Sequence, residues 1–554
     1  MHERVNKAAP ALAFGLYLAL SLLFFGTMHG YASHVFGYGG DSFTSVWCLQ
    51  WWPWAIAHGL DPFVSRKVWY PQGVEMTWVT SIPALSLIGL PLTLLAGAIV
   101  TFNSLCMLAP ALAAWSAFLL ARHLTRDGLA AFFAGYVYGF SAYELGHMLG
   151  HLNLAMTCVV PLLLLVCLKR LAGELSRRRC VTLLTLALLA QFGISLEILC
   201  TACVFAALCW LVFLPLVTRR QRLGLYALAA EFMAAGVIVA AITSPFLFFL
   251  FRGMRHLTPV LQPPGLYSAD ALGFLVPGAL TRVGRAFTAT AGRFPGGLGE
   301  QTAFLGLPVI LILTAFFARR LASPAAQGML AMLLLLILCS LGPRLWLDGT
   351  RTGLSLPWAL ADKVPLLRVA LPGRLTLYVF LLAGLVMGLW IAEHATGLAR
   401  WRRVLLASIA CLSLLPNRAV TGVWTSAQLL PFFDSVRNGS GLRRGQNALL
   451  LPFGPFGANM MWQWQARYGF NQAAGYTGLV PFPDAVDPMV VALGSGQIVP
   501  GLGSMIVGYC RAHRVGAIVA GPSTAPALMA VLRTIGWPSE SQGGVVLFSD
   551  PAGR

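Results

Sequence analysis

Long apolar stretches constrain the fold of this chain more than any other feature of its sequence. Two of them, residues 181–217 and 226–251, are longer than the core helices of soluble proteins. They suit helices that cross a bilayer with about 20 residues each. Hydrophobic residues make up 58% of the chain and charged residues only 10%, against roughly 45–50% and 25% in soluble proteins. The composition therefore predicts a polytopic α-helical membrane protein and excludes coiled-coil, fibrous and disordered classes.

The formal net charge of +19 raises the question of nucleic-acid binding. The Lys and Arg residues occur as short clusters between the apolar stretches rather than as one basic face. Such clusters orient membrane helices, so we expect membrane lipids as partners and no nucleic acid. Most of the eleven cysteines lie within or beside apolar stretches, without Cys-x-x-Cys or Cys/His zinc spacing. They indicate neither a disulfide framework nor a structural metal.

The sequence predicts about eleven membrane-spanning helices, with lengths near those that a bilayer requires. The first has Arg4 and Lys7 before it and no small-residue cleavage site after it, so we interpret it as a retained helix. The expected spans are 10–27, 104–121, 129–144, 152–168, 181–197, 199–217, 224–250, 303–318, 326–342, 374–393 and 404–416.

A further apolar segment, residues 82–100, decides the topology. If it does not cross the membrane, the short basic loops all lie on the side of the N-terminus, as the positive-inside rule requires. Its Pro83, Gly89, Pro91 and Gly97 suit a re-entrant or surface-lying segment that is buried against other helices. We predict such a segment; the alternative is an ordinary span with reversed downstream topology.

This topology places the N-terminus in the cytoplasm, and the large loops and the C-terminal tail outside. The tail is more polar, with strand-like runs at 448–451, 517–520 and 545–548 and a helical pattern near 525–535. The sequence therefore predicts a transmembrane domain at 1–416 and a small extracytoplasmic α/β domain at 417–554.

Asp41 is the first acidic residue after the first predicted helix, within Gly39-Gly40-Asp41-Ser42-Phe43. The two glycines permit a tight turn that brings the carboxylate to the membrane surface. The aromatic residues that follow suit a helix lying in the interface; they include Trp47, Trp51, Trp52 and Trp54. Asp41 fits two roles, a helix N-cap and a general base, and the first does not exclude the second.

Several short motifs follow Asp41 along the sequence. The first large loop adds a Gly-x-Asp-Pro-Phe turn at 59–63 and Tyr-Pro-x-Gly at 70–73. Further matching segments are 119–124, 143–154, 267–270, 300–306, 364–368 and 372–374. Together they resemble the bacterial GT-C superfamily of polytopic glycosyltransferases, whose members include protein mannosyltransferases and the aminoarabinose transferase acting on lipid A. The resemblance covers the membrane part, and it implies a GT-C-like fold with interfacial helices in the first external loop.

The resemblance also implies an activity. In that superfamily an acid on the first external loop is catalytic, which here implies Asp41 as the base that deprotonates an acceptor hydroxyl. The donor would be a sugar linked to polyprenyl phosphate, and the acceptor a glycan, lipid or protein outside the bacterial inner membrane. The anionic leaving group needs positive charge, and among the external arginines we expect Arg368 and Arg374 to bind it.

Other polar residues are candidates for the same site. Glu197 lies near the external end of its predicted membrane helix. Placing an ionisable side chain in a membrane costs free energy, so such a residue is expected to have a function. Asp270 and Glu300 are alternative second acids on a later external loop. Glu144, His147 and His151 have the spacing of one helix face and suit a divalent metal such as Mg, Mn or Zn, although Gly146 and Gly150 weaken the helix. The simpler interpretation of these histidines is ordinary hydrogen bonding.

Two other functions remain open. A transporter or lipid flippase would normally show two related halves with broken helices, which we do not find. A GT-C-like scaffold without catalysis is the other alternative. In the tail, Trp462, Trp464, Tyr468 and Tyr476 are candidates for stacking on acceptor sugars, or else form an ordinary hydrophobic core.

Overall fold

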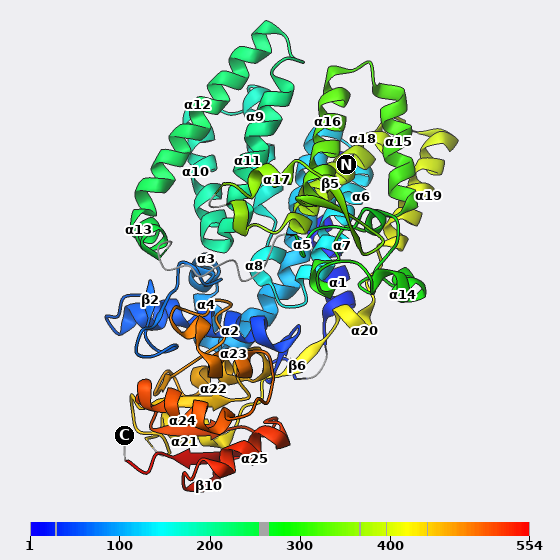
Figure 1. Cartoon of the computed structure of the whole chain (residues 1–554). Helices are drawn as coiled ribbons and strands as arrows, with labels where there is room; N and C mark the ends of the chain where they lie inside the picture. The colour runs from blue at the N-terminus through cyan, green and yellow to red at the C-terminus, as the bar shows by residue number, and fades with distance from the viewer. Residues whose placement is uncertain are drawn as a thin grey trace. The chain divides into compact units, whose positions relative to one another are not determined.

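The computed structural model describes residues 2–27, 30–253, 265–364, 367–394, 396–439 and 441–552, without the side chains of 2–7 and 368. The chain forms two compact units, drawn in Figure 1. Unit 1 contains Met1–Thr27, Ser104–Ile242 and Gln262–Val423, and unit 2 contains Met28–Asn103, Thr243–Leu261 and Trp424–Arg554. This division differs from the predicted one at 416/417, because the first large loop packs with the C-terminal tail.

Unit 1 is built from helices, arranged in two neighbouring groups. In one group α10 packs against α9, α11 and α12, and in the other α18 packs against α6, α15, α16 and α19. The helices are α1 (His2–Phe25), α5 (Ala98–Thr125), α6 (Gly128–Gly139), α7 (Ala142–His147), α8 (Leu152–Ala155), α9 (Val159–Leu171), α10 (Arg177–Ile194), α11 (Leu196–Phe213), α12 (Arg219–Ile242), α14 (Thr288–Ala291), α15 (Leu307–Arg320), α16 (Pro324–Ser340), α17 (Trp358–Ala361), α18 (Thr376–Ala392), α19 (Gly397–Ser413) and α20 (Arg418–Thr421).

Each predicted span falls on a helix, and the chain is a multi-pass helical membrane protein. Among the described residues, six helical segments are long and apolar enough to cross a bilayer: Ala8–Phe25, Ala98–Thr125, Leu152–Leu171, Leu196–Phe213, Arg219–Ile242 and Pro372–Ala392. Other predicted spans lie on shorter helices, such as α6 with 12 residues and α15 with 14. The count of eleven spans stays a prediction.

Small residues bring α18 and α6 together. A Cβ at Gly384 would lie only 2.6 Å from the Ala134 carbonyl oxygen, and one at Gly388 only 3.2 Å from that of Ala130. Glycines four residues apart allow helix backbones to approach closely in a membrane, where van der Waals packing replaces the hydrophobic effect as the driving force. These glycines fix α18, which follows directly on the segment that carries Arg374.

Residues 82–100 have no helix long enough to cross a membrane. They form α3 (Pro83–Ile88) and α4 (Leu90–Ala96), of six and seven residues, and then enter α5. Gly97 adopts a φ of 88°, which ends α4 before α5 begins. Leu94 and Leu95 on α4 are 78% and 86% exposed. These two short helices are consistent with a re-entrant or surface-lying segment, whose position relative to the membrane stays a prediction.

Unit 2 contains a five-stranded sheet with the order β10-β11-β9-β7-β8. β7 is parallel to β8 and β9, while β11 is antiparallel to β9 and β10. The strands are β7 (Asn447–Leu451), β8 (Asn471–Gln472), β9 (Ala517–Ala520), β10 (Ser539–Gln542) and β11 (Val545–Ser549). The helices of the tail are α21 (Pro431–Arg437), α22 (Asn459–Gln465), α23 (Pro488–Gly494), α24 (Leu502–Ala512) and α25 (Pro526–Thr534). The predicted strands and the predicted helix near 525–535 are confirmed.

The same unit includes elements from the first large loop. β1 (His34–Phe36) pairs antiparallel with β6 (Trp424–Ser426), so the start of the loop is joined to the start of the tail. α2 (Gly39–Ala57) follows β1 and packs against α22. The remaining elements of this unit are β2 (Val64–Ser65), β3 (Val74–Glu75) and α13 (Ser244–Gly253), while the hairpin of β4 (Arg344–Leu347) and β5 (Thr350–Ser355) belongs to unit 1.

A buried ion pair gives unit 2 a pH-dependent stability. Nε2 of His513 lies 2.9 Å from the Asp484 carboxylate. Burial alone lowers the pKa of His513, but Asp484 and the Tyr509 carbonyl raise it on balance above 6.5. The stabilisation is therefore complete below about pH 6.5 and is lost as the pH rises through the folded-state pKa.

We expect the difference in thermal unfolding temperature between the full chain and its Asp484→Asn variant to be largest below about pH 6.5 and to shrink toward pH 8.5. A difference that stays constant with pH would show that His513 does not titrate against Asp484.

Candidate functional site

Asp41 lies in the first turn of α2 and is half-buried. The N-cap of this helix is Tyr38, without a side-chain capping hydrogen bond, so the interpretation of Asp41 as the N-cap is wrong. A carboxylate in the first turn is still favoured by the helix dipole. The helix start thus positions Asp41 without using it as the cap.

The backbone around Asp41 is held by residues from the C-terminal tail. Thr425 donates from Oγ1 to the Gly37 carbonyl at 2.6 Å, and the Thr44 hydroxyl donates to the Tyr476 carbonyl at 2.6 Å. A Cβ at Gly40 would lie 3.2 Å from Cε1 of Tyr476 and 3.6 Å from Cβ of Pro455. Glycine at position 40 therefore allows the Tyr476 ring to approach the backbone beside Asp41.

The tryptophans of α2 form a core and do not lie at a surface as predicted. Trp47, Trp51 and Trp52 are buried, with exposures of 0%, 1% and 5%. The Trp47 indole donates to Oε1 of Gln463 at 2.9 Å, and its ring stacks on Trp51 at a centroid distance of 5.1 Å. The prediction of an interfacial aromatic helix is wrong for these three residues, because residues of the first large loop and of the tail cover them.

The four aromatic residues of the tail that are candidates for stacking on acceptor sugars differ in their burial. Trp462 and Tyr468 are buried, with their indole and hydroxyl groups donating to the carbonyls of Gln428 and Trp47. Trp464 is half-buried. Tyr476 is half-buried and lies against Gly40. Of the four, Tyr476 is the one that the structure brings against Gly40, the neighbour of Asp41. No sequence pattern predicts this approach.

In unit 1 the structure brings three of the candidate residues together. Arg374, in η6 (Pro372–Leu375), donates from Nη1 to Glu197 and from Nη2 to Glu300, each at 2.6 Å. A second bond runs from its Nε to Glu300 at 3.0 Å. The backbone amide of Leu371 also donates to Glu197 at 3.2 Å. We call Glu197, Glu300 and Arg374 the carboxylate clamp.

The clamp changes the interpretation of Arg374. One guanidinium with two carboxylates carries a formal charge of −1, so Arg374 offers no uncompensated positive charge to a phosphate. The prediction of Arg374 as a phosphate ligand therefore has no support in its contacts. Arg368 lies in η5 (Leu367–Val369), and its side chain is outside the described part of the chain, so its role stays a prediction.

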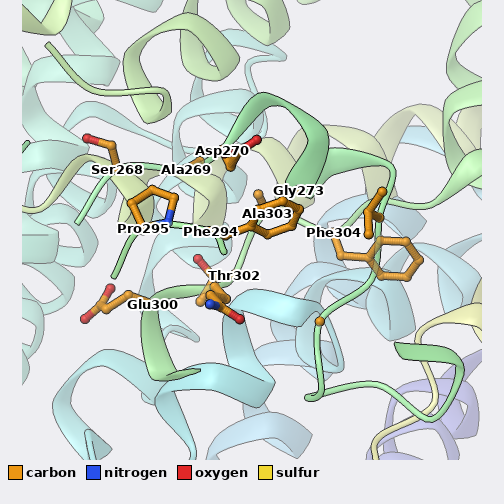
Figure 2. A pocket seen from close by; sticks show the side chains of 13 residues that line it. Ser268, Ala269, Asp270, Gly273, Phe294, Pro295, Glu300, Thr302, Ala303 and Phe304 are labelled. Atoms are coloured by element: carbon orange, nitrogen blue, oxygen red, sulfur yellow. The ribbon is translucent and has the colours of Figure 1, made fainter. Parts of the chain in front are cut away.

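Asp270 and Glu300 line a cavity of about 10 Å³ in unit 1. Figure 2 shows Asp270 and Glu300 on different sides of this cavity, with their carboxylates pointing away from each other. Asp270 accepts backbone N–H groups from Leu272 at 2.9 Å, Asp348 at 3.1 Å and Gly349 at 2.8 Å. It therefore caps η2 (Ala271–Phe274) and fixes the turn between β4 and β5. Its role as a second acid stays a prediction.

Replacing Asp270 by Ala would leave these half-buried N–H donors without the carboxylate that accepts them. We expect the variant to lose about 1–3 kcal/mol of unfolding free energy and Asp270→Asn to lose less, because its amide oxygen can still accept. Thermal unfolding of the two variants in detergent measures the difference. Equal stability of Asp270→Ala and the unmodified chain would contradict the structural role.

Glu144, His147 and His151 do not share one helix, because α7 ends at His147 and His151 is the N-cap of α8. The two imidazole rings lie 5.7 Å apart at an angle of 69°. Both carboxylate oxygens of Glu144 and both ring nitrogens of His147 are buried without a hydrogen-bond partner. Burial, together with Arg374 and His151, holds the pKa of His147 well below its usual range, so the ring is neutral.

Within the described residues, no group of three or more His, Cys, Asp or Glu side chains is arranged to hold a metal ion. Glu144, His147 and His151 as they lie therefore do not form a ligand set. A divalent metal at this position stays a prediction.

Comparison with solved structures shows the fold. The chain is similar to the arabinofuranosyltransferase AftD from Mycobacteria, with a TM-score of 0.58 and 15% sequence identity over 98% of this chain and 39% of that chain. A variant of the same enzyme matches with a TM-score of 0.58 at 14% identity, over 98% and 41% of the two chains. The Archaeoglobus fulgidus oligosaccharyltransferase matches with a TM-score of 0.50 and 13% identity, over 93% and 69%.

The chain thus spans about two fifths of the length of the arabinofuranosyltransferase. At these identities the comparison shows the fold alone, and that fold is the GT-C fold that the sequence motifs resemble. None of the curated proteins matches the chain in sequence. A family model matches residues 10–473, and the chain belongs to that family, which is described as "Domain of unknown function (DUF6311)".

Proposed function

We propose that this chain is a glycosyltransferase that moves a sugar from a polyprenyl-phosphate donor to a glycan, lipid or protein acceptor. The GT-C fold supports glycosyl transfer in general. The observation that carries the specific proposal is the position of Asp41, half-buried in the first turn of α2, where residues of the tail fix its backbone. The chain has helices that can cross a bilayer, and a polyprenyl carrier dissolves in the hydrocarbon part of that bilayer.

Asp41 is the general base in this proposal. Its carboxylate takes the proton of an acceptor hydroxyl, and the hydroxyl oxygen attacks the anomeric carbon. The bond from that carbon to the phosphate oxygen breaks, and the electron pair leaves with the polyprenyl phosphate. The displacement inverts the anomeric centre. Because the leaving group is already a stable anion, the step needs positive charge rather than a general acid, and Arg368 is the proposed source.

The location follows from the same proposal. A lipid-linked donor is needed where nucleotide sugars are absent, so the chemistry belongs outside the cytoplasm. We propose that the chain lies in a bacterial inner membrane with its N-terminus in the cytoplasm and its C-terminal domain in the periplasm, in agreement with the distribution of basic clusters.

The test uses the purified full chain in nanodiscs with a radiolabelled polyprenyl-phosphoryl pentose or hexose. A transferase consumes the donor, releases the sugar to water slowly, and transfers it to added acceptor glycosides. A pentose is the first choice because the similar AftD is an arabinofuranosyltransferase. Movement of intact donor across vesicle membranes without consumption would identify a flippase instead and overturn the proposal.

A further inference from the structure

An apolar surface begins with the exposed residues Pro455 and Phe456, beside Asp41 in unit 2. Pro455 lies 3.6 Å from the Cβ position of Gly40, directly beside Asp41. Phe456 follows in η7 (Gly454–Phe456) and is 57% exposed. η7 packs against both α2 and α23, so this surface continues from the start of α2 to the C-terminal helices.

The surface contains several exposed apolar side chains. In the loop after Tyr476, Phe482 is 60% exposed, and Val486 in η8 (Asp484–Val486) is 63% exposed. Val491 on α23, which packs against η7 and η8, is 55% exposed. We call Phe456, Phe482, Val486 and Val491 the apolar apron. Apolar side chains that are exposed on elements packed against one another suit the binding of an apolar group.

The apron lacks charge although the chain carries +19. Residues 469–510 contain no Lys or Arg and only two acids. Asp484 is buried and paired with His513, and Asp487 accepts the backbone N–H groups of Met489 and Val490 at the start of α23. Both acids therefore have partners within the unit. Residues 469–510 offer no basic side chain to an acidic peptide or a polyanionic glycan, whereas an acyl or prenyl chain needs none.

Tyr476 joins this surface to Asp41. Its ring lies against Gly40, and the residue is half-buried, so part of it faces outward. An aromatic ring offers a flat apolar face to the C–H groups of a sugar ring, and its hydroxyl can hydrogen-bond. The neighbouring carboxylate is the group that would receive the proton of the sugar hydroxyl.

We propose that Tyr476 and the apolar apron form the acceptor subsite, and that the acceptor is a glycolipid. This inference rests on the proposed transferase function. The sugar ring of the acceptor lies on Tyr476 with its hydroxyl toward Asp41, and the lipid portion lies over Phe456, Phe482, Val486 and Val491. Tyr476 is a substrate-positioning residue, and the apron determines specificity for the lipid portion.

The experiment compares methyl and dodecyl glycosides of the same sugars as acceptors, with the full chain in nanodiscs and a radiolabelled polyprenyl-phosphoryl pentose. We expect the dodecyl glycoside to have a KM about tenfold lower than the methyl glycoside, and Tyr476→Ala to raise the KM of both about tenfold. Tyr476→Phe keeps the ring and should restore most of the affinity. The double variant Phe482→Ser with Val486→Ser should remove the preference for the dodecyl chain.

Leu429→Ser is the matched control, because Leu429 is an exposed apolar residue of the same unit outside the apron, and it should keep the dodecyl preference. Equal KM values for the two glycosides, or a Tyr476→Ala variant with unchanged KM, would overturn the inference while leaving the transferase in place. Absence of both donor hydrolysis and transfer in the unmodified chain would instead overturn the proposed function.

Discussion

Asp41→Asn is expected to slow glycosyl transfer by about 10²- to 10⁴-fold, the usual contribution of a positioned general base. Asn has nearly the shape of Asp but cannot accept the proton of the attacking hydroxyl. The loss should appear in kcat, because the backbone contacts around the residue, from Thr425, Thr44 and Tyr476, do not depend on its charge. Initial rates with a radiolabelled polyprenyl-phosphoryl sugar measure the effect.

Asp61→Asn is the matched control. Asp61 lies in the same large loop, is exposed, and accepts the Phe63 amide at 2.9 Å in a turn that Asn can also form. We expect this variant to keep full activity. Full activity of Asp41→Asn as well would show that another group removes the proton.

Arg374→Met is expected to cause the largest loss of stability, about 3–5 kcal/mol of unfolding free energy. The side chain of Arg374 is 15% exposed, and it holds Glu197 and Glu300 at 2.6 Å each. Without it, two largely buried carboxylates face each other without a counterion. Fluorescence-monitored unfolding in detergent measures the loss.

Arg293→Met tests whether any lost ion pair has this effect. Arg293 pairs with Asp348 at 2.5 Å, but the two side chains are 53% and 44% exposed. We expect a loss of under about 1 kcal/mol, as for other solvent-exposed pairs. Similar losses in the two variants would contradict the structural role of the carboxylate clamp.

The helices and strands were predictable because each depends on a local pattern. The apolar run at 104–121 became α5, and the strand-like run at 517–520 became β9. The glycines and prolines of 82–100 also indicated a break, which the structure shows as two short helices. Local patterns did not reveal that the first large loop and the tail share one unit, because β1 and β6 are almost 400 residues apart in the chain.

The sequence indicated which residues are candidates for the site, but not which of them contact one another. Asp41 stood out as a rare acid, but the approach of Tyr476 to the neighbouring Gly40 links residues more than 400 positions apart. Likewise, Glu197 and Arg374 are 177 positions apart in the chain, so no local sequence motif predicts their ion pair. Trp47 and Trp51 are typical of an interfacial helix, yet residues of the tail and of the first large loop bury them. In each case the environment of the residue depends on contacts with residues that are distant in the sequence.

The most direct measurement is a cryo-EM structure of the full chain in nanodiscs with a polyprenyl-phosphoryl sugar that cannot react. We expect density for the sugar beside α2, with its anomeric carbon facing a space that an acceptor hydroxyl can enter next to the Asp41 carboxylate. Density for the sugar at a position remote from residue 41 would contradict this expectation.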